Sequence, residues 1–128
     1  MNNEQILLRL FNDAFYAFEK IKNSRFEFLH KIRVKSFNDK IKQKFVLKDL
    51  DIYPKLEFDY KTNIYSISFY FLKTKIKLKS LYLTDNKRIW VINNENRVIL
   101  FLDKKKGQLQ KEAALFLLKE LKKSSLLF

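Results

Sequence analysis

The chain has 128 residues and a formal net charge of +13, with 27 Lys and Arg residues against 14 Asp and Glu residues. It contains no Cys, which excludes disulfides, thiolate catalysis and cysteine-based zinc sites. The single Gly and single Pro exclude a glycine-rich phosphate-binding loop. Apolar residues make up 47% of the chain, enough for a hydrophobic core, and the length fits one domain over residues 1–128. No cofactor or metal site is predicted.

Residues 1–22 have the spacing of an amphipathic helix, and Asn2 or Asn3 can cap its first turn. The predicted buried stripe is Ile6, Leu7, Leu10, Ala14, Phe18 and Ile21. Charged residues interrupt this segment, so it is not a signal peptide. No run approaches the roughly 18 apolar residues of a membrane-spanning helix. We therefore expect a soluble, cytoplasmic protein.

A second helical region follows. Residues 24–27 (SRFE) match a capping box, in which Ser24 and Glu27 satisfy backbone N–H groups at the start of a helix. The buried side of that helix is predicted to hold Phe26, Leu29, Ile32 and Val34. The related pattern at residues 36–39 (SFND) predicts a break or a third short helix, which carries Phe37, Ile41 and Phe45.

After Pro54 the apolar period changes from about 3.6 residues to 2, which indicates β-strands. The predicted strands are residues 55–60, 65–71, 75–79, 88–92 and 97–102, with turn-forming residues between them. In the second of these, Ser66, Ser68 and Tyr70 alternate with apolar residues and are predicted to face solvent. Short links between successive strands imply antiparallel neighbours.

Residues 108–123 predict a final helix with a buried stripe of Leu109, Ala113, Phe116, Leu117 and Leu121. The expected fold class is therefore α+β, with N-terminal helices, a four- to five-stranded antiparallel meander sheet and a C-terminal helix.

Basic residues dominate positions 20–48, where Glu27 and Asp39 are the only acidic residues. A row of cations on a helix can neutralise phosphates and release their counterions. The alternative is that these residues form a solvent-exposed helix face that binds no partner. Nucleic acid or an acidic partner is predicted to contact Lys31, Arg33, Lys35, Lys40, Lys44 and Lys48.

A second basic pattern alternates lysines with other residues, so that a strand would place every lysine on one face. This predicted surface consists of Lys73, Lys75, Lys77 and Lys79, with Tyr70 exposed beside it for base stacking. Lysines on an edge strand also prevent sheet-to-sheet aggregation, which is the competing explanation. The run of Lys104, Lys105 and Lys106 adds three more cations.

His30 is the single histidine, and no carboxylate pattern around it indicates catalysis. Acidic pairs at residues 49–51 and 57–59 offer oxygen ligands for Mg²⁺ only weakly.

Residues 81–120 resemble the C-terminal part of RelE/HigB-type ribonuclease toxins. The resemblance rests on residues 88–91 (RIWV), residues 98–101 (VILF), the lysine run that follows, and a helix with Glu112 and Ala113. It implies a small basic α+β protein that cuts messenger RNA on the ribosome without a metal. Arg88, Lys104 and Lys105 would then be the matching basic residues.

Three functional hypotheses follow. The first is a small, non-enzymatic binding protein that docks RNA, DNA or a ribonucleoprotein through its lysine-rich faces. The second is an inhibitor or accessory protein, of the kind that phages and mobile elements encode, which covers an acidic or nucleic-acid-binding surface of a larger machine. The third is the metal-independent ribonuclease.

Overall fold

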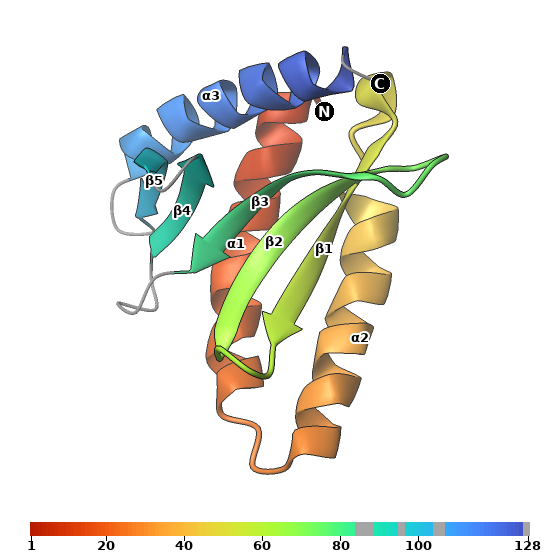
Figure 1. Ribbon diagram of the computed structural model, residues 1–128, viewed down its shortest axis with the longest axis vertical. Helices are drawn as coiled ribbons and strands as arrows, with labels where there is room; N and C mark the ends of the chain where they lie inside the picture. Colours follow the sequence, from red (N-terminus) through yellow and green to blue (C-terminus); the bar gives the residue numbers. More distant parts are fainter. Residues whose placement is uncertain (84–88, 95–96, 104–106, 127–128) are drawn as a thin grey trace.

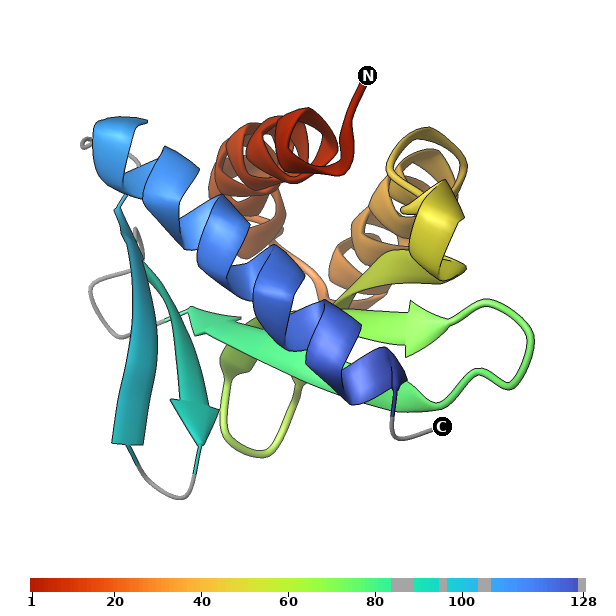
Figure 2. The same cartoon turned by 90° about the horizontal axis from the view of Figure 1, so that it is seen from above.

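The computed structural model describes residues 1–83, 89–94, 97–103 and 107–126, with side chains for residues 1–82 and 111–126. Three helices lie on the same side of the antiparallel strands β1 to β3 (Figures 1 and 2). The helices are α1 (Asn3–Lys22), α2 (Glu27–Lys44) and α3 (Gly107–Ser125), with a short 3₁₀ turn η1 (Lys48–Leu50) after α2. The strands are β1 (Ile52–Asp59), β2 (Ile64–Phe71), β3 (Lys77–Leu83), β4 (Ile89–Asn94) and β5 (Arg97–Asp103).

The predicted class, α+β with N-terminal helices, an antiparallel sheet and a C-terminal helix, is confirmed. Strands β1, β2 and β3 form a three-stranded antiparallel sheet with long runs of paired residues. β4 and β5 pair with each other and stand next in the strand order, but β4 meets β3 through only two residue pairs. The extensively paired part of the sheet is therefore three-stranded, and the uniform meander of four to five strands is not supported.

Helix α1 is the main apolar element of the core. Asn2 caps it: its side chain accepts from the Gln5 N–H, and the Gln5 side chain accepts from the Asn2 N–H. Seven side chains of this helix are buried: Leu7, Leu10, Phe11, Ala14, Phe15, Phe18 and Ile21. Five of them belong to the predicted stripe. Phe11 and Phe15 widen it, so that α1 meets α3 and the sheet through one broad face.

Helix α2 departs from the sequence prediction. It begins at Glu27 after Phe26, without a side-chain cap, and continues unbroken through residues 36–39. The predicted capping box at Ser24 is wrong, because Phe26 occupies the N-cap position; the Ser24 hydroxyl instead accepts a hydrogen bond from Arg33 at 3.0 Å. Phe26 and Ile32, predicted to be buried, are exposed. Only His30 and Ile41 of α2 are buried, so this helix contributes little to the core.

The strand face that packs on the helices contains Leu56, Ile67, Phe69 and Leu81, all almost fully buried. β1 starts at Ile52, earlier than predicted, and includes Pro54, which an edge strand tolerates. The opposite face is less exposed than the alternation predicts. Ser66 and Ser68 are both buried. Ser66 lies between the longer side chains of Glu57 and Tyr82, and the hydroxyls of Ser68 and Ser80 are 2.8 Å apart.

Helix α3 crosses α1 and buries Ala113, Ala114, Leu117 and Leu121. Phe116, predicted to be buried, is more than one-third exposed, and Ala114 lies in the core instead. Leu109 is also predicted to be buried, but its side chain is not among those that the structure describes. Within the described parts of the chain, none of the helices combines the length and apolar composition needed to cross a bilayer.

Candidate nucleic-acid interface

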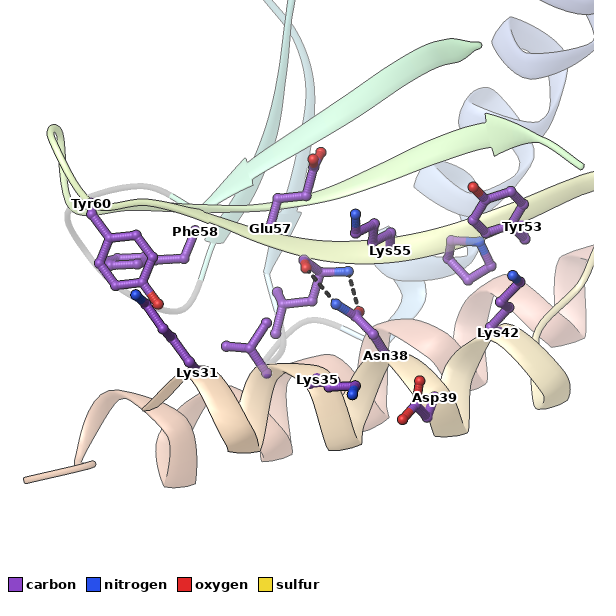
Figure 3. A pocket seen from close by; sticks show the side chains of 13 residues that line it. Lys31, Lys35, Asn38, Asp39, Lys42, Tyr53, Lys55, Glu57, Phe58 and Tyr60 are labelled. Atoms are coloured by element: carbon purple, nitrogen blue, oxygen red, sulfur yellow. Dashed lines mark hydrogen bonds between the residues drawn. The ribbon is translucent and has the colours of Figure 1, made fainter. Parts of the chain in front are cut away.

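A groove of about 510 Å³ runs between α2 and the edge strand β1 (Figure 3). Four lysines line it, three from α2 and one from β1: Lys31, Lys35, Lys42 and Lys55. Tyr53 and Tyr60 lie toward its two ends, and Asp39 and Glu57 are its two acidic residues. We refer to this feature, defined by its four lysines, as the cationic groove.

Asn38 fixes the distance between the two walls of the groove. Its side-chain amide donates to the Leu56 carbonyl at 2.8 Å, and its carbonyl oxygen accepts from the Leu56 N–H at 2.6 Å. Asn38 thus binds the free edge of β1 as a neighbouring strand would.

The lysines of the cationic groove are largely uncompensated. Lys31 lies 3.4 Å from Glu27, but both side chains are well exposed, so this ion pair contributes little. Among the described residues, Lys35, Lys42 and Lys55 form no ion pair. The Lys42 ammonium lies 5.2 Å from the centre of the Tyr53 ring, within the range of a cation–π contact.

The two acidic residues do not cancel this charge. Glu57 is already engaged: its carboxylate accepts from the Tyr70 hydroxyl at 2.7 Å and lies 3.0 Å from the Lys77 ammonium. Burial would raise the pKa of Glu57, but hydrogen bonds from Ser68, Tyr70 and Lys77, with the Lys77 charge, lower it overall. Glu57 therefore stays ionised and belongs to a closed network, which leaves Asp39 against four lysines.

His30 lies behind the groove in a cluster of aromatic residues. Its Nε2 is 2.6 Å from the Tyr65 hydroxyl and its Nδ1 is 3.2 Å from the Tyr60 hydroxyl. Burial lowers the pKa of His30, although the charge of Glu27 acts in the opposite direction. Burial, with the nearby Tyr60 hydroxyl, raises the pKa of Tyr65 to about 12. Both ring nitrogens are occupied, so the cluster packs α2 onto β1 and β2 and buttresses Tyr60.

The basic residues predicted in positions 20–48 do not form one face. Lys31 and Lys35 line the cationic groove. Arg33 instead donates to the Lys20 carbonyl at 3.2 Å, which ties it to the end of α1. Lys44 lies 3.4 Å from Asp13 of α1. Lys40 borders a separate groove between α1 and α2, together with Arg33.

Lys40, Lys44 and Lys48 would share one face only if the helix continued to Lys48, but α2 ends at Lys44 and Lys48 lies in η1. Lys42 and Lys55, which line the groove, are absent from the sites predicted by sequence.

The predicted strand face of four lysines is also wrong. β3 begins at Lys77, and Lys73 lies in the preceding turn. Lys75 also precedes the strand and has a left-handed backbone, with a φ of 59°. A bulge shifts the register, so that Lys77 pairs with Tyr70 and Lys79 with Phe69. Successive residues of β2 face opposite sides, so these two lysines do as well.

Tyr70, predicted to be an exposed stacking platform, is only partly exposed. Its ring stacks on Tyr53 with centroids 5.6 Å apart, and its hydroxyl is bonded to Glu57. Burial and the Glu57 contact both raise the pKa of Tyr70. The side chain belongs to the network on the open sheet face and is not free to stack on a base.

The remaining predicted basic residues, Lys104, Lys105 and Lys106, fall outside the described residues, as does Arg88. The resemblance to ribonuclease toxins therefore stays a prediction. Among the residues that the structure describes, no three His, Asp or Glu side chains gather closely enough to hold a metal ion.

Comparisons with protein-family models, with curated proteins and with solved structures found no match to this chain.

Proposed function

We propose that this protein binds nucleic acid through the cationic groove between α2 and β1. One observation supports the proposal: four lysines from two different elements converge on one concave surface, and three of them form no ion pair with any residue that the structure describes. Holding like charges together costs free energy unless an anion neutralises them. A polyanion is suited to this surface because several phosphates can be bound at once, with release of their counterions.

The proposal treats the protein as a non-enzymatic, cytoplasmic binding protein, alone or within a ribonucleoprotein. We also propose that β4 and β5 extend the three-stranded sheet and so complete the four- to five-stranded meander that the sequence predicts. Backbone phosphates are the expected contacts, since lysine acts as a point charge that reads no base sequence. Affinity is therefore expected to depend strongly on salt and weakly on sequence.

The test is a pair of charge reversals in the groove, Lys35→Glu with Lys42→Glu, measured against labelled RNA and DNA. Each lost phosphate contact should reduce the magnitude of the log affinity–log salt slope by about 0.7 for single strands and about 0.9 for duplexes. A matched control reverses Lys111 and Lys119 on α3, which are exposed and do not line the groove. Both double variants carry the same net charge.

Binding that weakens only in the groove variant supports the proposal. Equal weakening in both variants would show a response to net charge alone. Absence of binding at about 0.1 M salt, where the electrostatic attraction is still sizeable, would overturn it. The midpoint of thermal unfolding should stay nearly constant, because exposed lysines contribute little to stability.

The inhibitor or accessory-protein hypothesis has one supporting observation, which is the exposure of apolar side chains at the start of α2, including Phe28 and Ile32. A pull-down with and without nuclease treatment separates it from the leading proposal. A partner that stays bound after nuclease digestion, and is lost on Lys35→Glu with Lys42→Glu, would favour a protein target with an acidic surface.

A further inference from the structure

Aromatic side chains are exposed at the end of the cationic groove where α2 begins. Phe26 is 53% exposed, Phe28 is 61% exposed and Tyr60 is 45% exposed. The rings of Phe26 and Phe28 are stacked, with centroids 5.8 Å apart. We call these three residues the aromatic end. Exposed apolar groups that cluster together are typical of binding surfaces.

Lys31 joins the aromatic end to the cationic groove. Its ammonium lies 5.3 Å from the centre of the Tyr60 ring. Lys31 also follows Phe28 by three residues on α2, and residues at this spacing are neighbours on a helix surface. Figure 3 shows Tyr60 and Lys31 side by side at one end of the groove. The rings and the first groove lysine therefore form one continuous surface.

The Tyr60 ring is held in place although nearly half of it is exposed. Its hydroxyl is bonded to His30 Nδ1 at 3.2 Å. Its ring meets Phe58 edge to face, with centroids 4.7 Å apart and an interplanar angle of 86°. A ligand that stacks on a fixed ring loses less affinity to ordering of the protein. Tyr60 is thus a preorganised platform.

We infer that the cationic groove takes single-stranded nucleic acid, with unpaired bases stacking on the aromatic end. This inference rests on the proposed function and specifies the class of its ligand. The faces of paired bases are covered within a duplex, so only a single strand can stack its bases on Tyr60 or Phe28 while its phosphates contact the lysines. Lys31, Lys35 and Lys42 extend along about 16 Å of helix, enough for a short stretch of strand.

The charge around the aromatic end favours this ligand over a protein. Lys31 and Lys35 stand beside the exposed rings, so a protein partner must bring both an apolar surface and carboxylates to match them. A single strand has both kinds of group in every nucleotide: a base, which can stack on the rings, and a phosphate, which can pair with a lysine. Bringing two copies of this chain together at the aromatic end would oppose like charges.

The experiment titrates the full chain with labelled oligonucleotides of about twelve nucleotides, a length within the site sizes of small single-strand-binding folds. The probes are oligouridylate RNA, oligothymidylate DNA and a mixed-sequence DNA duplex of equal length. Single strands should bind at least ten-fold more tightly than the duplex. Tyr60→Leu and Phe28→Leu should each weaken single-strand binding about 5- to 150-fold, the range expected for loss of one stacked base.

Controls separate stacking from folding and from charge. Tyr60→Phe keeps the ring and should retain single-strand affinity, even though it removes the hydroxyl bond to His30. The leucine variants should leave duplex affinity and the salt slope unchanged, since they remove no charge.

Two failures are distinguishable. If duplex and single strands bind equally, and the leucine variants bind as the unmodified protein does, the single-strand inference is overturned while the groove proposal survives through its lysine variants. If none of the probes binds, the proposed function fails first, and the single-strand inference fails with it.

Discussion

Helices α1 and α2 have similar lengths, 20 and 18 residues, but they are held to the rest of the protein in different ways. α1 buries seven apolar side chains, whereas α2 buries only His30 and Ile41. Apolar burial is strong and non-directional, so it fixes α1 along its whole length. α2 is fixed at a few points, by Asn38 on Leu56 and by His30 on Tyr65. A helix docked in this way can keep the rest of its surface charged.

The largest expected effect comes from truncating a buried side chain of α1. Phe11 is fully buried, so Phe11→Ala should lower the free energy of unfolding by about 3–5 kcal/mol through lost burial and a residual cavity. The matched control is Phe28→Ala on α2, where the same side chain is mostly exposed and a change within about 0.5 kcal/mol is expected. Urea unfolding measures both. Similar losses at the two positions would contradict the difference between the helices.

The next largest effect comes from removing the hydrogen bonds that hold α2 to β1. Asn38→Ala removes two hydrogen bonds and leaves the Leu56 N–H and carbonyl without their partner, so stability should fall by about 1–3 kcal/mol. Asn38→Asp keeps an acceptor for the Leu56 N–H but loses the donor, and should not restore the full stability. Gln43→Ala, an exposed amide on the same helix, serves as the control. Equal unfolding midpoints for the variants at 38 and 43 would show that the Leu56 contacts do not hold the helix.

The same difference explains how much of the fold can be predicted. The stripe of α1 is visible in the sequence because burial imposes its period on the apolar residues, as at Leu7, Leu10 and Ala14. α2 buries too little to show such a period, so Phe26 and Ile32 are misplaced by a pattern-based prediction. The capping box at Ser24 is also wrong: the helix begins after Phe26, and the Ser24 hydroxyl is bound by Arg33, nine residues away. A pattern of four neighbouring residues does not reveal a hydrogen-bond partner that lies further along the chain.

The sheet shows a similar limit. Alternation correctly predicts the buried positions Ile67 and Phe69. It fails at Ser68, whose burial depends on neighbours in other strands, and at Lys77 and Lys79, which a bulge turns to opposite faces. A bulge is one extra residue opposite another strand, so the sequence of a single strand does not reveal it.

The candidate site was predictable only within α2. Lys31 and Lys35 are four residues apart, and Lys42 follows Lys35 by seven, so helical spacing alone places these three on one side. That spacing was the available signal for Lys42. Lys55 could not be found in this way, because its position in the groove depends on β1 lying beside α2, which is fixed by the contacts between Asn38 and Leu56.

The smallest expected effect at neutral pH concerns His30, the second residue that holds α2 to the sheet, and the way stability depends on pH. Its pKa in the folded protein is lowered from the ordinary value of 6.5, chiefly by burial. Below pH 6.5 the unfolded chain therefore binds more protons at this residue than the folded chain does, and the free energy of unfolding should fall as the pH is lowered.

Well above pH 6.5 the contribution of His30 should be constant, because the residue is then neutral in both states. Urea unfolding between pH 7.5 and pH 5 measures this, with His30→Gln as a control that cannot titrate but can still bond to a tyrosine hydroxyl. The stability of the unmodified protein should fall more steeply than that of the variant over this range. Parallel profiles would mean that His30 stays as accessible to protons in the folded protein as in the unfolded chain. Glu57 acts in a separate range: its pKa is lowered, so its contribution is lost only at more acidic pH, as the folded protein takes up that proton.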